Sequence, residues 1–367
     1  MVDCRTICEL IEELAPPARA EQWDNIGLQL GEPDALVKSV LVSLDIESQV
    51  VEEAVAEGVD MIIAHHPFFF KPISHLRTDQ PWGSMVKKLL KHDVMVYIAH
   101  TNLDNADEGI NHYLADYLGL KNAAVLAPAD GQKLYKLVVF VPKDNVDAVR
   151  GAISEAGGGW LGNYSHCTFQ TLGEGSFKPL GGTKPYIGQV GELERVAEYR
   201  LETIVLADKL SRVLEAMTEA HPYEEVAYDV YPLANEGKPY GLGRVGDLAE
   251  AENLEAFARR VKRTLGCEQV RVVGDIQHPM TRVAVCGGSG ASLVDHALRQ
   301  KADVLVTGDL KFHEAQDAVA KGLAIVDAGH YATERIIVPV LARYLQEKLD
   351  STKVIMSQEN TNPWQHF

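Results

Sequence analysis

The sequence predicts an α/β protein built from two similar α/β halves with mostly parallel sheets, together with an inserted ferredoxin-like domain. Near the start of the chain, short apolar runs alternate with amphipathic helical segments, and the same alternation resumes after residue 240. Between these two portions the expected element order is β-α-β-β-α-β, which is the ferredoxin-like order. We therefore expect residues 1–131 and 241–367 to form the two halves and residues 132–240 to form the insertion.

The first half is expected to begin with an acidic amphipathic helix, because Ile7, Ile11 and Leu14 recur at helical spacing. The segment Trp23–Leu28 is interpreted as a turn, with a pocket lining as the alternative. Strands are then expected at 37–46, 61–64 and 94–99, with helices at 48–57 and 85–92. This alternation of strands and helices is typical of a parallel sheet covered by helices.

A linker is expected at Ala127–Gly131, where the pattern changes. The insertion then shows strands at 135–141, 164–172, 198–206 and 226–233, with helices at 144–156 and 209–220. Such a unit of about a hundred residues is complete in itself. Within it, His221–Glu225 is interpreted as a solvated loop rather than an ion site.

The second half resumes the doubly wound pattern. The expected elements are strands at 241–248, 270–273, 283–285, 304–306 and 323–326, a helix at 254–265, and a long final helix from His330. Gly287–Gly290 follows a strand and precedes a helix. Such a turn can cradle a phosphate, but without a complete GxGxxG it is more often a tight turn.

Composition limits the partners of the chain. A formal net charge of −17 disfavours nucleic acid and anionic membrane, since a phosphate backbone is held mainly by Lys and Arg. The five cysteines are scattered without a CxxC pair, which favours a reducing cytoplasm over a disulfide framework. We find neither a signal-peptide pattern nor an apolar run of the ~20 residues that a membrane span needs.

Candidate metal ligands follow two of the expected strands. His65 and His66 end the strand at 61–64 and precede Pro67, and Asp104 lies beyond the strand at 94–99. Open α/β sheets place their ligands at this end of the strands. Neighbouring side chains of an extended chain point in opposite directions, so His65 and His66 share one ion only if the backbone turns sharply. A pair of metals accommodates both.

His330 and Glu334 complete the set, because residues four apart on a helix lie on one face, about 5–6 Å apart at Cβ. Five side chains give each of two metals three contacts if one carboxylate bridges, and positions remain open for water. Without cysteine the set suits zinc, manganese, iron or cobalt. The structural alternative is a hydrogen-bonded strand end and a surface pair.

Asp309 and His313 repeat the four-residue spacing. They are interpreted either as a helix N-cap followed by a partly buried histidine, or as groups that orient a ligand or carry a proton. The second interpretation is preferred to direct ligation. His100 is the other candidate for the proton carrier.

Five motifs together resemble those of the NIF-three-like dinuclear-metal family, often called GTP cyclohydrolase I type 2 homologues. They are WDNIGLQLG, IIAHHPFFF, AHTNLDN, TGDLKFHEA and DAGHYATE. The resemblance covers both outer portions, and the middle segment, with HPYEEVAYDVYPL, is similar to the PII-like or CutA-like insertion of the longer members. It implies that two metals, zinc first, are bound by His65, His66, Asp104, His330 and Glu334. It also implies a homohexameric toroid with the sites facing an internal cavity.

These observations lead to two functional hypotheses. The first is a metal-dependent hydrolase of a small anionic, nucleotide-like or phosphorylated substrate, with GTP ring opening as the activity that the family label suggests. The catalytic residues themselves are not identified. The alternative is a non-enzymatic regulatory or scaffold protein whose insertion senses a ligand or partner.

Overall fold

The computed structural model describes residues 2–129 and 133–365, and the chain divides into two compact units. Residues 1–129 and 240–367 form one, called here the core unit, and residues 130–239 form the other, called the insert unit. The end of the expected linker and the expected boundary at 131/132 lie outside the described residues. Ala127 and Pro128, the start of that linker, belong to a strand instead.

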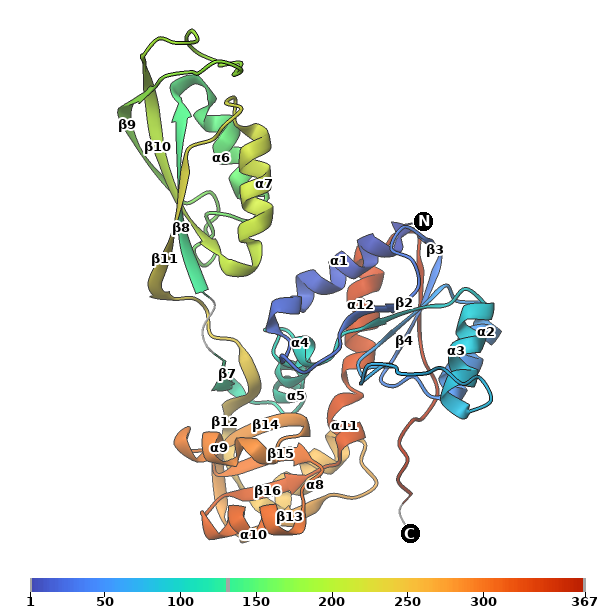
Figure 1. Ribbon diagram of the computed structural model, residues 1–367. Coiled ribbons are helices and arrows are strands. Elements are labelled where there is room, and N and C mark those ends of the chain that lie inside the picture. The colour runs from blue at the N-terminus through green and yellow to red at the C-terminus, as the bar shows by residue number, and fades with distance from the viewer. Residues whose placement is uncertain (1, 130–132, 366–367) are drawn as a thin grey trace. The chain divides into compact units, whose positions relative to one another are not determined.

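The first sheet of the core unit, in which Figure 1 labels β2 and β4, has the strand order β17-β4-β5-β6-β2. Its four neighbouring strands β17 to β6 are parallel, and β2 is antiparallel to β6. Helices α1 and α12 pack on one face, and α2 and α3 pack on the other. Burial on both faces explains why the central strands are continuous apolar runs. The bounds are β2 (Gly27–Leu30), β4 (Ser39–Ser43), β5 (Met61–Ala64), β6 (Met95–Ile98), β17 (Lys353–Met356), α1 (Cys4–Leu14), α2 (Ser48–Glu57), α3 (Pro81–Lys91) and α12 (Ile337–Lys348).

The second sheet of the core unit has the order β13-β16-β15-β14-β12-β7. Helices α5 and α8 cover one face, and α9 and α10 cover the other. The bounds are β7 (Lys121–Pro128), β12 (Gly241–Asn253), β13 (Arg271–Val273), β14 (Pro279–Ser289), β15 (Val304–Gly308), β16 (Ala324–Asp327), α5 (Ile110–Tyr117), α8 (Leu254–Leu265), α9 (Val294–Arg299) and α10 (Phe312–Ala320). Two further short strands, β1 (Val2–Asp3) and β3 (Leu36–Val37), pair with each other.

The α/β class is confirmed, but the sheets are more mixed than expected. In the second sheet only β14, β15 and β16 run parallel, while β13, β12 and β7 join it antiparallel. The halves also exchange strands. Strand β7 comes from the first portion but pairs with β12, and the C-terminal β17 pairs with β4. Each sheet of the core unit therefore contains one strand from the other portion of the sequence.

The final helix is interrupted. Helix α11 (His330–Glu334) ends before α12 begins at Ile337, so the expected continuous helix from His330 is two helices. Asp104 closes another short helix, α4 (Thr101–Asp104), where the sequence suggested a loop. None of the described helices is long and apolar enough to cross a membrane.

The insert unit contains an antiparallel four-stranded sheet with the order β11-β8-β10-β9. Helices α6 and α7 pack against one face of it, as Figure 1 shows, and their apolar side chains form the core of this unit. The elements in chain order are β8 (Lys133–Pro142), α6 (Val146–Glu155), β9 (Thr168–Phe177), β10 (Glu194–Leu206), α7 (Leu210–Ala220) and β11 (Tyr228–Glu236).

A buried arginine connects the second sheet to the segment that carries Asp104. The Arg244 side chain on β12 donates to the carbonyl oxygens of Gly241 and Gly243 and, across the core unit, to those of Ala106 and Asp107 directly beyond α4. Burial lowers the pKa of Arg244. The guanidinium stays charged, since its ordinary pKa lies above 12, and its bonds to four carbonyls compensate the lost hydration.

We expect Arg244→Met to lower the free energy of unfolding by about 2–4 kcal/mol, because buried carbonyls lose their donors. Urea unfolding of the metal-free protein measures this change. The control Arg259→Met removes an exposed arginine that pairs with Glu255 on α8, and should cost no more than about 0.5 kcal/mol. Equal losses for the two variants would contradict the structural role assigned to Arg244.

Candidate metal centre

His65 and His66 lie at a sharp turn of the backbone directly after β5. The amide groups of both residues donate to one acceptor, the carbonyl oxygen of Leu44, at 3.2 and 2.9 Å. The alternation of an extended strand is thereby broken, and the two imidazoles lie side by side with ring centroids 4.9 Å apart. With this sharp turn the two histidines can contribute to one site.

Each of three imidazoles is oriented by a hydrogen bond from its Nδ1 atom. His65 donates to the carbonyl oxygen of Ala99 at 2.8 Å, His66 to Asp45 at 2.6 Å and His330 to Asp309 at 2.7 Å. Because Nδ1 carries the proton, Nε2 is the remaining ligand atom on each ring. The same arrangement recurs in many proteins where histidine binds a metal.

The Nε2 atoms converge on the carboxylate of Glu334. Its Oε2 atom lies 2.9 Å from His330 Nε2, 3.0 Å from His66 Nε2 and 3.9 Å from His65 Nε2. Asp104 Oδ1 lies 3.8 Å from His65 Nε2. All five side chains expected from the sequence are thus brought together.

Two of the candidate ligand groups share one carboxylate. His65, Asp104 and Glu334 form one group, and His66, His330 and Glu334 form the other. Ligand atoms about 2.0–2.2 Å from a tetrahedral ion are roughly 3.3–3.6 Å apart. The observed separations of 2.9–3.9 Å bracket this range. Small side-chain adjustments would therefore suffice to hold a metal ion.

Three buried polar atoms at the centre form no hydrogen bond of suitable geometry within the described residues, although two imidazole nitrogens lie close to the last of them: His65 Nε2, Asp104 Oδ1 and Glu334 Oε2. An unsatisfied buried polar atom costs about 1–3 kcal/mol, and more when it is charged. These three atoms are also the members of the first ligand group. A bound cation would satisfy all of them together.

The titration behaviour of the cluster also fits a cation site. Burial lowers the pKa of His65 to about 3, so its imidazole is neutral, as a ligand must be. Burial raises the pKa of Asp104 well above its usual value, and the charge of Glu334 adds to this effect. Burial opposes protonation of His66, but Asp45 and Glu334 outweigh it and raise the pKa of His66 to about 10. Metal binding must therefore expel a proton from this cluster.

Sequence reasoning missed several residues that support the ligands. Asp45 ends the expected strand but was not connected to His66. Asp24 was assigned to a simple turn, yet its side chain is fully buried and accepts hydrogen bonds from Nδ1 of His100 and from Thr101. His100 forms a third cluster with His65 and His66. The turn interpretation of Trp23–Leu28 is therefore wrong for Asp24.

The other open interpretations are resolved by contacts. Asp309 is not a helix N-cap, since Lys311 occupies that position, and instead accepts from His330. His313 is exposed, and its Nδ1 atom lies 3.1 Å from Oε1 of Gln316 on the same helix. His221 in the insert unit is buried, and its two ring nitrogens bond the backbone of Phe140 and Tyr223, so it is neither solvated nor a free ligand.

The Gly287–Gly290 segment makes room for the ligands instead of cradling a phosphate. The amides of residues 287, 288 and 290 donate to the side chains of Asn111, Thr333 and Thr307. Gly288 has φ = +60°, and a Cβ atom there would lie 2.2 Å from Oε1 of Glu334. Only glycine therefore permits the carboxylate of Glu334 to lie where it does.

The fold and the site define an α/β protein with an imidazole and carboxylate cluster that could hold a metal ion. The chain belongs to the Duf34/NIF3 (NGG1p interacting factor 3) family, whose model matches residues 2–363. The family resemblance expected from the sequence motifs is thereby confirmed.

Relatives cover the whole chain. A Bacillus subtilis protein called GTP cyclohydrolase 1 type 2 homolog is 47% identical over 367 residues, 99% of this chain and 98% of the relative. One of the same name from Halalkalibacterium halodurans is 45% identical over 98% of both chains. The crystal structure of a Bacillus cereus protein related to NIF3 is 43% identical, with a TM-score of 0.91, and covers 100% of this chain and 99% of its own.

Replacing Gly288 should weaken metal binding. In Gly288→Ala the new methyl group displaces the carboxylate of Glu334, so we expect the zinc affinity, measured by competition with a chromophoric chelator, to fall at least about tenfold. The control Gly266→Ala has a similar φ of +65°, and nothing lies within 4 Å of its Cβ position. It carries the same backbone strain of about 1–2 kcal/mol. Equal zinc affinities in the two variants would contradict the role of Gly288.

Proposed function

We propose that the core unit binds two divalent metal ions and hydrolyses small phosphorylated or nucleotide-like molecules. Zinc is our first choice of metal, with iron, manganese and cobalt as alternatives. The observation that carries the proposal is the Glu334 carboxylate, which belongs to both ligand groups and is suited to bridge two ions. His65 and Asp104 would complete one site, and His66 and His330 the other. Each ion would keep open positions for water and substrate.

A cavity of about 530 Å³ beside the centre supports an anionic substrate. Its lining includes His330, the arginines Arg271 and Arg335, and the carboxylates of Glu268, Asp309 and Asp327. Arg271 pairs with Asp327, but Arg335 forms no ion pair within the described residues, and its guanidinium lies over the ring of Tyr331. A guanidinium without a carboxylate partner suits a phosphate group. The cavity volume falls in the range typical of small-molecule sites.

When bound, a metal pair lowers the pKa of a water molecule and stabilises charge that develops on the substrate. The residues around the metal pair would then have two roles, which are to orient the ligand imidazoles and to carry a proton. Asp45, Asp309 and the carbonyl oxygen of Ala99 hold the three ligand imidazoles in place. We assign the proton carrier to His100, which Asp24 orients through Nδ1 and whose ring lies 5.0 Å from that of His65. GTP ring opening is the specific reaction that the names of the relatives suggest.

The remaining parts of the proposal concern organisation. We propose that residues 132–240 are an inserted ferredoxin-like domain between halves 1–131 and 241–367, and the β-α-β-β-α-β order with strand order β11-β8-β10-β9 supports this classification. The resemblance supports a PII/CutA-like insertion and a homohexamer. The free state of the five cysteines supports a cytoplasmic protein.

The hydrolase proposal predicts that full-length protein loaded with zinc, manganese, iron or cobalt turns over GTP or another member of a nucleotide and phosphomonoester panel. In Glu334→Gln we expect kcat to fall at least about a hundredfold, because the shared carboxylate loses its charge. The control Glu347→Gln changes an exposed glutamate of α12 and should leave kcat unchanged. Chromatographic separation of the products measures both rates.

Arg335→Lys separates substrate binding from chemistry. Lysine keeps the charge but loses the planar fork, so KM for an anionic substrate should rise roughly tenfold while kcat changes little.

Metal retention without turnover on any member of the nucleotide and phosphomonoester panel would instead favour a regulatory or scaffold protein.

A further inference from the structure

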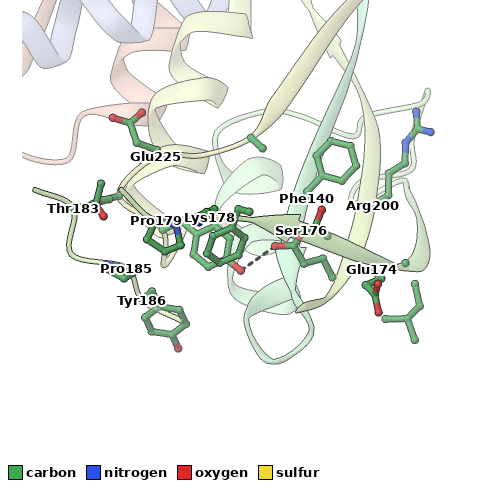
Figure 2. A pocket seen from close by; sticks show the side chains of 18 of the residues that line it. Phe140, Glu174, Ser176, Lys178, Pro179, Thr183, Pro185, Tyr186, Arg200 and Glu225 are labelled. Atoms are coloured by element: carbon green, nitrogen blue, oxygen red, sulfur yellow. Dashed lines mark hydrogen bonds between the residues drawn. The ribbon is translucent and has the colours of Figure 1, made fainter. Parts of the chain in front are cut away.

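The insert unit contains a cavity of about 560 Å³, separate from the metal centre (Figure 2). It lies on the sheet face opposite α6 and α7, because its lining residues Phe140 and Arg200 alternate with the strand residues that form the core under these helices. Figure 2 shows Phe140 and Arg200 on one side of the cavity and Pro185 and Tyr186 on the other. The volume falls within the range of small-molecule sites.

Two glycines of β9 leave space in the sheet face for this cavity. Gly173 and Gly175 alternate along the strand, so both face the same side. A Cβ atom at residue 173 would meet nothing nearer than 4.0 Å, whereas one at residue 175 would lie 2.0 Å from Oε2 of Glu198. The Glu198 carboxylate therefore lies directly over Gly175.

Glu198 is a buried carboxylate without a cation. It is 8% exposed, and Tyr223 donates its hydroxyl hydrogen to Oε1 at 2.9 Å. No Lys, Arg or His pairs with it within residues 2–129 and 133–365. Arg200, two residues along the same strand, pairs with Glu202 instead. A buried charge is normally paired, so this carboxylate lacks a donor that a ligand can supply.

Aromatic rings flank the same carboxylate. The ring centroid of Tyr223 lies 5.7 Å from that of Phe177 and 6.2 Å from that of Tyr186. His221 bonds the amide of Tyr223 and the carbonyl of Phe140, which fixes the Tyr223 segment against the sheet. Rings beside a carboxylate favour a cation with a flat apolar frame. Four glutamates and two basic residues line the cavity, so its net charge is also negative.

We propose that this cavity is a second small-molecule site, which binds a ligand that carries an amino, amidine or guanidine group on a flat apolar frame. The cationic N–H donors bond the free oxygen of Glu198, and the frame packs against Phe177 and Tyr223. The site does not depend on the metal centre. It gives the insert unit a ligand-sensing role that is independent of the hydrolase proposal.

Benzamidine and its neutral isostere benzamide test this proposal on the full-length protein. Isothermal titration should show one benzamidine bound per chain and at least about tenfold weaker binding of benzamide, because only the cation forms a charge-assisted pair. In Glu198→Gln the Tyr223 hydrogen bond is retained and the charge is lost, so the preference for benzamidine should disappear. The control Glu215→Gln removes an exposed charge from α7 and should bind like the wild type.

A second variant tests the cavity itself. Gly173→Val fills the cavity beside Glu198, with which residue 173 is paired across the strands, and should weaken both probes at least about tenfold while the circular dichroism spectrum stays unchanged. The proposal is overturned if the wild type binds neither probe or binds both equally. It is also overturned if Glu198→Gln and Gly173→Val both leave benzamidine binding unchanged.

Discussion

The candidate centre depends on one constraint, which is that the Nδ1 atom of each ligand imidazole is already hydrogen-bonded. The acceptors are the carbonyl of Ala99, the carboxylate of Asp45 and the carboxylate of Asp309. All three lie just beyond the C-terminal ends of parallel strands, β6, β4 and β15. The two sheets of the core unit therefore contribute the groups that set both the tautomer and the direction of the ligands.

The electrostatics of the cluster follow from this arrangement. Two carboxylates, Asp104 and Glu334, approach neutral or proton-sharing imidazoles in a buried space where charge is poorly screened. Without a cation the cluster keeps unsatisfied atoms and holds a proton on His66 or His330. A divalent cation would reverse these costs together, which supports the proposal that these residues are metal ligands.

The sequence predicted the elements that are buried on both faces. Strands β4, β5 and β6 are continuous apolar runs, so their positions could be read directly. Strands β7 and β17 carry more exposed residues and join sheets far from their sequence neighbours, so no local pattern places them. The long final helix was too simple a prediction, because Pro339 lies in the first turn of α12 and cannot donate a hydrogen bond to the carbonyl of Arg335, which indicates a break just after Glu334.

The residues of the site likewise divide into those that a local sequence pattern indicates and those that it does not. The five candidate ligands could be selected from the sequence because they follow strand ends or have helical spacing, and the structure brings their side chains together. Asp45 and Asp24 contact His66 and His100 across 21 and 76 residues of sequence, and Gly288 is defined only by its distance to Glu334. Contacts of this kind are set by tertiary packing, and a single sequence contains no periodic signal for them.

The most direct test of the account is anomalous diffraction, at the zinc absorption edge, from crystals of the full-length protein grown with zinc. The account predicts two peaks about 3.5–4 Å apart, each about 2.0–2.2 Å from its nearest ligand atoms, with Glu334 bound to both. A centre without anomalous density, or zinc bound elsewhere while Glu334 keeps no metal contact, would contradict it.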